Sequence, residues 1–286
     1  MTRRPWLVFA LAATACWGVW GALIELPEKA GFPATLGYAV WSATMVPCAL
    51  VALKMSGAGI ERDPRSIRLG AIVGFAGAGG QLALFEALRS GPAFIVFPLI
   101  SLYPVLTILL SVSLLKERAP GRHWVGVALA LPGIALLSYV PPDERLVQGY
   151  VWLLLSIGVF AAWGVQAYVM KLANLSMTAE GLFCYMALTA VMLAPIAVAM
   201  TDFGPRVNWG PSGAQSAAAI HLLNSLGALS LVYALRRGKA IIVVPMTALA
   251  PVITIALSLA IYGRMPLPAQ TGGMVLALAA IALMAT

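Results

Sequence analysis

The chain has 286 residues, of which 61% are hydrophobic and only 10% are charged, and its net charge is +8 at pH 7. A soluble domain carries about 25% charged residues, so this composition excludes a soluble fold and indicates a membrane protein. The positive charge is not gathered in a basic stretch with interleaved aromatic residues, so the sequence gives no sign of a nucleic-acid partner.

Ten apolar runs follow one another along the chain, each close to the roughly 20 residues that cross a hydrocarbon layer as a helix. The runs are continuous rather than alternating, which favours helices over the strands of a membrane barrel. The first run is too long for a signal-peptide core and is interpreted as a span. We therefore predict an all-α membrane protein with ten spans, near residues 5–24, 35–54, 69–88, 93–114, 122–140, 150–170, 181–200, 214–234, 240–262 and 267–285.

The second half of the chain repeats the first. Residues 87–111 nearly recur 147 positions later as residues 234–258, and residues 17–19 recur 146 positions later as residues 163–165. The chain is therefore two copies of one five-helix unit. In membrane proteins, duplicated units often build carriers whose two halves move around a shared central site.

Because each unit has an odd number of spans, the second unit, residues 146–286, is predicted to be inverted relative to the first, residues 1–145. A cytoplasmic N-terminus places most Lys and Arg residues on the cytoplasmic side, as the positive-inside rule requires, and puts the C-terminus there as well. The cytoplasmic set is Arg3, Arg4, Lys54, Arg62, Arg65, Arg68, Lys116, Arg118, Arg122, Lys171, Arg236, Arg237 and Lys239, against Lys29, Arg89, Arg145, Arg206 and Arg264 outside. We expect a bacterial inner-membrane location.

Short motifs occur in a fixed order along the first unit. They are Trp17-Gly18 late in the first span, Ala87-Leu88 before a turn, Pro98 and Pro104 in the fourth span, and Lys116-Glu117-Arg118 with Gly126 at the fifth. In this order, spacing and duplication the chain resembles the EamA repeat of the drug/metabolite transporter superfamily. The resemblance implies a carrier of small organic metabolites, with a central cavity lined mainly by spans 1, 3, 4, 6, 8 and 9. The second unit departs from the pattern, because Gly263-Arg264 stands where the first has Lys116-Glu117.

Prolines occupy equivalent positions in the fourth and ninth spans. Pro98 and Pro104, like Pro245 and Pro251, remove backbone donors in mid-span and leave carbonyl groups without partners. Such groups must face protein or a watery cavity. The alternatives are ordinary kinks and broken helices whose freed backbone groups contact a substrate, and the repetition in both units favours broken helices.

Few polar residues lie within the spans, where each costs a few kcal/mol. Gln81 and Gln166 offer amide donors and acceptors, and His221 and Asn224 form a polar pair in the eighth span. We predict that these four side chains bind the polar end of a substrate. The alternative for His221 is that a neighbouring side chain simply satisfies it.

Aromatic residues complete the predicted site. Trp17 and Trp163 are repeat-related and lie about twelve residues into their spans, nearer mid-membrane than the headgroups. With Trp20, they are predicted to form cavity walls rather than interfacial anchors. Tyr103 and Tyr233 are weaker candidates for the same role.

Glu86, near the end of the third span, is the candidate for proton coupling, because a carboxylate that faces a dry cavity can carry a proton. Arg89 lies three residues further on, on the same helical face. The alternative is therefore that the two residues form a structural ion pair.

No enzyme, cofactor or metal site is expected, because the sequence has no histidine pair at metal spacing, no nucleophile elbow and no phosphate-binding glycine loop. The leading hypothesis is a secondary transporter that exports amino acids or similar small amphipathic metabolites by alternating access. The second is a carrier of anionic or nucleotide-like compounds, or an importer, that uses basic residues, namely Arg89, Arg236, Arg237 and Lys239. The third is a scaffold that transports nothing. The expected partners are a small-molecule substrate and membrane lipid, and the small residues of each unit's last span leave room for a homodimer.

Overall fold

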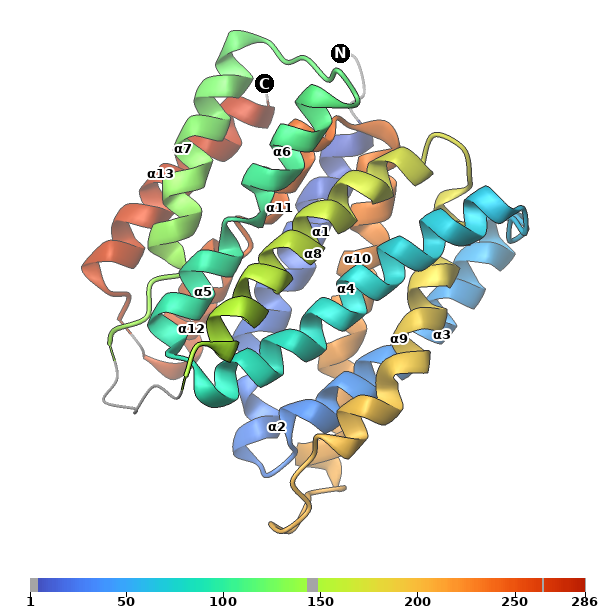
Figure 1. Ribbon diagram of the computed structural model, residues 1–286. Helices are drawn as coiled ribbons and strands as arrows, with labels where there is room; N and C mark the ends of the chain where they lie inside the picture. The colour runs from blue at the N-terminus through green and yellow to red at the C-terminus, as the bar shows by residue number, and fades with distance from the viewer. Residues whose placement is uncertain (1–4, 143–148, 264, 286) are drawn as a thin grey trace.

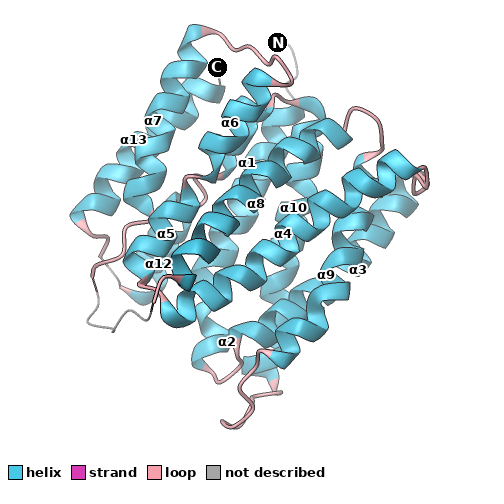
Figure 2. Ribbon diagram, in the orientation of Figure 1, coloured by secondary structure: helices cyan, strands magenta, loops and turns pink. Residues whose placement is uncertain are grey.

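A computed structural model describes residues 5–142, 149–263 and 265–285. The regular structure of these residues is helical throughout, and Figure 2 shows the helices joined by short loops. The predicted sidedness of Arg3, Arg4, Arg145 and Arg264 lies outside the described residues.

The two units contain corresponding sets of helices. The first unit holds α1 (Pro5–Leu23), α2 (Glu25–Lys29), α3 (Ala34–Ser56), α4 (Pro64–Ser90), α5 (Ala93–Ser101), α6 (Tyr103–Ser113) and α7 (Gly121–Leu137). The second holds α8 (Val151–Ala173), α9 (Ala179–Ala199), a π-helical turn η1 (Pro211–Gln215), α10 (Ser216–Arg237), α11 (Ala240–Thr247), α12 (Pro251–Tyr262) and α13 (Pro268–Ala285).

Nine segments of the described chain are long and apolar enough to cross a bilayer. The fourth and ninth predicted spans are each built from two helices, α5 with α6 and α11 with α12. The remaining predicted span is α7, whose 17 residues rise about 25 Å, slightly less than the hydrocarbon layer. The predicted all-α, ten-span class of fold is confirmed.

Local sequence signals set the ends of several helices. The Asp63 side chain accepts hydrogen bonds from the backbone N–H groups of Arg65 and Ser66, and Pro64 occupies the first turn of α4. At its C-terminal end, α12 stops at Gly263, whose φ of 64° is a left-handed conformation that glycine adopts without strain.

The two units run in opposite directions through the molecule (Figure 1). Helix α1 starts, and its counterpart α8 ends, at the end of the bundle that is uppermost in the view. Helix α13 also ends there, so the first described helix begins and the last one finishes at one end, which we call the terminal side. This antiparallel arrangement of equivalent helices is the inverted repeat that an odd number of spans predicts.

Helices pack mainly across the boundary between the units. Helix α4 packs against α8, and its counterpart α10 packs against α1, while α3 contacts α9 and α7 contacts α13. The two units therefore form one interlocked body, with the innermost surface between α1, α4, α8 and α10.

Loop contacts repeat the same symmetry at the two ends. On the terminal side, the Glu61 carboxylate accepts a hydrogen bond of 2.7 Å from the backbone N–H of Thr178. At the opposite end, Asn208 donates from its backbone N–H to the carbonyl of Gly31, at 3.1 Å. Residues 61 and 208, like residues 31 and 178, are 147 positions apart, so the duplication extends to the connections between helices.

Candidate functional site

A cavity of about 450 Å³ lies between the two units, within the size range of small-molecule sites. Its walls come from α1, α4, α6, α8, α10, the end of α11 and the start of α12. Three further side chains come from spans that the family resemblance did not implicate, namely Trp41 and Met45 of α3 and Met186 of α9.

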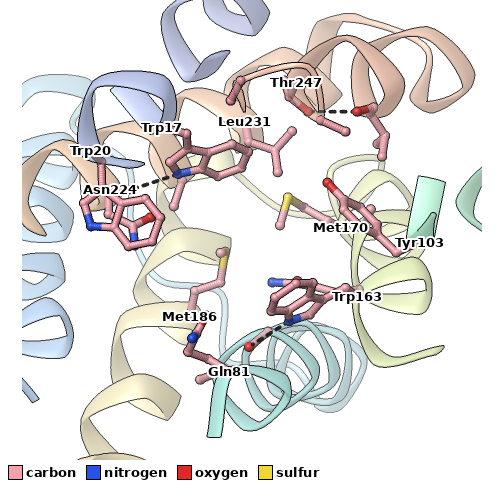
Figure 3. A pocket seen from close by; sticks show the side chains of 18 of the residues that line it. Trp17, Trp20, Gln81, Tyr103, Trp163, Met170, Met186, Asn224, Leu231 and Thr247 are labelled. Carbon is pink, nitrogen blue, oxygen red and sulfur yellow. Dashed lines mark hydrogen bonds between the residues drawn. The ribbon is translucent and has the colours of Figure 1, made fainter. Parts of the chain in front are cut away.

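Two tryptophans are held in the cavity wall by the same contacts in both units. The indole N–H of Trp17 donates to the carbonyl of Asn224, and that of Trp163 donates to the carbonyl of Gly77, each at 3.3 Å. The accepting residues are themselves 147 positions apart. Figure 3 shows Trp17 and Trp20 on one side of the cavity and Trp163 with Tyr103 on the other.

Close approach of these indoles requires glycine on the facing helices. A Cβ atom on Gly80 of α4 would lie 2.5 Å from Trp163 Nε1, and one on Gly227 of α10 would lie 2.6 Å from Trp17 Nε1. Any larger residue would therefore push the ring into the cavity, and the repeated glycines keep the space between the units open.

Hydrogen bonds join the broken spans to the helices that carry these tryptophans. The Thr107 hydroxyl of α6 donates to the Gly164 carbonyl, and the Thr254 hydroxyl of α12 donates to the Gly18 carbonyl, each at 2.9 Å. Gly18 and Gly164 directly follow the two repeat-related tryptophans. The second halves of the broken spans are thus tied to α8 and α1.

The helix interruptions lie close to, but not at, the first proline of each pair. Pro98 and Pro245 lie within α5 and α11, whereas Pro104 and Pro251 begin the helices that follow the interruptions. Proline is well tolerated in a first helical turn, where its missing N–H has no intrahelical partner to lose. The interruption of the second unit lines the cavity through Thr247, Ala248, Ala250 and Pro251, whereas the first contributes only Tyr103.

Polar groups without protein partners face this cavity. The side-chain amides of Gln81, Gln166 and Asn224 line it and make no hydrogen bond to the described part of the chain. The buried indole N–H of Trp41 likewise has no partner there. A donor or acceptor without a partner is costly, so the three amides are available to a bound molecule or to water, whereas the Trp41 nitrogen is itself enclosed by protein.

His221 lies behind the cavity wall rather than in it. Its Nδ1 accepts a hydrogen bond of 3.3 Å from the Trp20 indole, and its Nε2 faces Gly37 of α3. The side chain is 6% exposed, so it supports Trp20 from the side away from the cavity. The geometry corresponds to the alternative in which a neighbour satisfies the histidine.

Two other predicted residues are not brought to the cavity. Glu86 lies near the end of α4 that is remote from the terminal side, where its carboxylate accepts a hydrogen bond of 3.1 Å from Arg89 and both side chains are exposed. The Tyr233 hydroxyl donates to Glu180 at 2.6 Å and lines a separate surface groove. The ion-pair alternative for Glu86 is therefore the arrangement that the structure contains.

The described residues that line the cavity include no Lys, Arg, His, Asp or Glu. A net anion would therefore enter without a countercharge, which is expensive away from water. A neutral or zwitterionic molecule can instead use the amides, because each carries both a donor and an acceptor.

Comparison with known proteins identifies the family. The model of the EamA-like transporter family matches residues 4–139 and again residues 150–286. A protein of known crystal structure, 17% identical in sequence, superposes with a TM-score of 0.81 over 99% of this chain and 96% of its own, which shows the fold alone. An uncharacterized protein of Methanocaldococcus jannaschii, MJ1333.1, is 44% identical over 59 residues, covering 21% of this chain and only 43% of that protein. The two family matches together span nearly all of the sequence, and the chain belongs to the EamA-like transporter family.

Proposed function

We propose that this membrane transporter moves small amphipathic metabolites, with amino acids and related compounds as the first candidates, by alternating access and in the direction of export. As a member of a transporter family, the chain is not an enzyme. The observation that carries the proposal is the central cavity, which combines aromatic walls with unpartnered amides and has no Lys, Arg, His, Asp or Glu among its described lining residues.

The cavity suits a substrate with an apolar body and a compact polar end. Trp17, Trp20 and Trp163 offer large rigid faces for the apolar body. The amides of Gln81, Gln166 and Asn224 can donate to a carboxylate and accept from an ammonium group. An amino-acid zwitterion satisfies both requirements without adding net charge to the cavity.

The competing hypothesis of an anionic or nucleotide-like substrate depends on basic residues that lie elsewhere. Arg89 pairs with Glu86, and Arg236 donates to the Met177 carbonyl. Arg237 lies over the ring of Phe9, and Lys239 contacts the Arg118 carbonyl. Because none of these four residues lines the cavity, we do not favour this substrate class.

Unequal enclosure of the two broken spans supports alternating access. All eight residues of α11 are buried, whereas only Val96 and Ile100 are buried among the nine residues of its counterpart α5. We infer from this difference that the cavity is more tightly enclosed towards the terminal side, where α11 begins. In an inverted repeat, each unit can adopt the conformation of the other. If α5 becomes enclosed as α11 is now, and α11 opens as α5 is now, the cavity is enclosed at the opposite end.

We assign the terminal side to the cytoplasm of a bacterial inner membrane, because Lys54, Arg65, Arg236 and Lys239 all belong to that end. On this assignment the structure corresponds to a state that is closed towards the cytoplasm. Release of an exported substrate requires such a state.

Counterflow in proteoliposomes tests the substrate class. Labelled amino acids, nucleotides and sugars are offered as parallel panels, and we expect exchange of amino acids alone. Trp163→Ala should weaken it about tenfold through the loss of aromatic packing. Trp124→Ala, on the outer part of α7, is the matched control and should exchange normally. Exchange of nucleotides without amino acids would overturn the proposed substrate class.

A further inference from the structure

A groove of about 680 Å³ runs along the outer surface between α3 and α10, with α1 and α9 contributing at one end. No described residue lines both this groove and the central cavity. Most of its wall is apolar, from Pro47, Cys48, Val51, Ala52, Met55, Leu222, Leu226 and Leu229. Val51 and Met55 are 54% and 83% exposed, so this wall faces the acyl chains of the bilayer.

Among the described residues that line the groove, the charged and aromatic ones all lie at its terminal end. The Arg237 guanidinium lies 4.8 Å from the centre of the Phe9 ring and 5.7 Å from that of Tyr233. The Tyr233 hydroxyl in turn donates to the Glu180 carboxylate at 2.6 Å. These contacts hold a cation and a carboxylate on either side of one tyrosine.

The two charges do not neutralise each other. In the part of the chain that the structure describes, no ion pair joins Arg237 to Glu180, and the Arg237 side chain makes no hydrogen bond. Both residues line the groove, so both remain available to a molecule that lies in it.

The groove has the proportions of one lipid leaflet. From Leu222 to Arg237, α10 rises about 22 Å, which covers half of a hydrocarbon layer of roughly 30 Å and reaches the headgroup region. The apolar wall thus follows the path of an acyl chain, and the charged end lies where a headgroup begins.

We propose that this groove binds a phospholipid with a primary ammonium headgroup, of the phosphatidylethanolamine type, from the leaflet of the terminal side. One acyl chain lies between α3 and α10, the phosphate accepts hydrogen bonds from Arg237, and the ammonium donates to Glu180. An anionic lipid without an ammonium would leave the negative charge of Glu180 without a cationic partner, and a choline headgroup has no N–H to donate.

The same helix connects this groove to the transport cavity. Leu222, Leu226 and Tyr233 of α10 line the groove, whereas Asn224 and Ala228 line the cavity on another face. A lipid in the groove therefore packs against the back of a helix that forms the substrate site.

Native mass spectrometry of delipidated protein tests the proposal, with phosphatidylethanolamine, phosphatidylcholine and phosphatidylglycerol of identical acyl chains. We expect phosphatidylethanolamine to bind tightest, and Arg237→Gln to weaken it about tenfold. Glu180→Gln should remove the preference over phosphatidylcholine. The control for Arg237 is Arg236→Gln, because that side chain donates to Met177 instead, and the control for Glu180 is Glu86→Gln at the far end of α4.

If Arg237→Gln or Glu180→Gln fails to fold, a substitution that fills the groove without removing a charge still tests the proposal. Leu226→Trp places a bulky ring in the apolar part of the groove, and size-exclusion chromatography checks that the protein is intact. The Leu226→Trp variant should bind all three lipids more weakly than the wild type. Equal phosphatidylethanolamine binding by the wild type and Leu226→Trp, equal binding by Arg237→Gln and Arg236→Gln, or tightest binding of phosphatidylglycerol by the wild type would each overturn the proposal.

Discussion

The two broken spans have similar sequences but different surroundings. In the second unit, α11 is enclosed by α1, α6, α7, α8, α10 and α13. In the first unit, α5 packs mainly against α8 and α7. The prolines are equivalent, so they do not explain why α11 is more tightly enclosed than α5.

The difference lies in charged residues that cap helix ends on the terminal side. The Glu117 carboxylate, in the loop after α6, accepts hydrogen bonds of 3.1 Å from the backbone N–H groups of both Ala240 and Ile241, at the start of α11. A carboxylate is favourable at a helix N-terminus because it satisfies free N–H groups and the helix dipole. In the second unit, the sequence places Arg264 at the equivalent position.

A lysine completes the closure on the same side. Lys171, in the last turn of α8, donates to the carbonyls of Leu235 and Gly238 at 2.8 and 2.7 Å, at the end of α10. The residue 146 positions earlier is Glu25, which pairs with Lys29 of its own helix instead. The comparison teaches that side chains at helix ends, rather than the spans themselves, distinguish the two ends of this symmetrical carrier.

Removal of the Glu117 cap should have the largest effect on this asymmetry. Glu117→Ala leaves two N–H groups of a buried helix without acceptors, which costs about 3 kcal/mol. We expect a lower melting temperature in detergent and faster labelling of Val244→Cys, now 1% exposed, by an impermeant thiol reagent. The labelling uses a background in which Cys16, Cys48 and Cys184 are replaced by Ser. Unchanged labelling would mean that the cap does not hold this end closed.

Lys171→Met tests the second cap and should destabilise the protein by about 2 kcal/mol, because the methionine fills the space but leaves the two carbonyls without a donor. Thermal unfolding measures the loss. Glu25→Gln is the comparison at the equivalent position and should change stability little, since that pair is partly exposed. Equal losses of stability in the two variants would show that Lys171 does not distinguish the terminal side from the opposite end.

The hydrogen bond that joins each broken span to its neighbouring helix should contribute equally to stability in the two units. Thr107→Val and Thr254→Val each remove one hydrogen bond of the same length, 2.9 Å, and each should cost about 1 kcal/mol. Unfolding of both variants under the same conditions gives the comparison. A much larger loss for one of them would show that the asymmetry extends into the centre of the molecule.

Glu86→Gln should have the smallest effect. The side chain is 48% exposed and pairs with Arg89 at the end where α5 begins, and such exposed pairs contribute only about 0–1 kcal/mol. Substrate accumulation driven by an imposed pH gradient in proteoliposomes should be unchanged. Loss of that accumulation, with exchange retained, would restore Glu86 as the proton-coupling residue.

The sequence predicted some of the residues that line the cavity but not others. Trp17 and Trp163 could be found because they are related by the repeat and lie deep in their spans. Trp41 was missed because its counterpart 147 positions later is Leu188, so the duplication gives no signal. His221 and Tyr233 lie on α10, as do Asn224 and Leu231 of the cavity wall, but on other faces.

The sequence by itself determined the membrane class, the order of the spans and the inversion of the second unit, because hydropathy, length and an odd number of helices depend only on neighbours along the chain. The tertiary structure decided which side chains converge on the cavity and which of the two broken spans is more deeply buried. A helix that is apolar on every side gives no sign of the face that meets another helix. The caps formed by Glu117 and Lys171 join residues more than 60 positions apart, so they exist only once the two units have packed together.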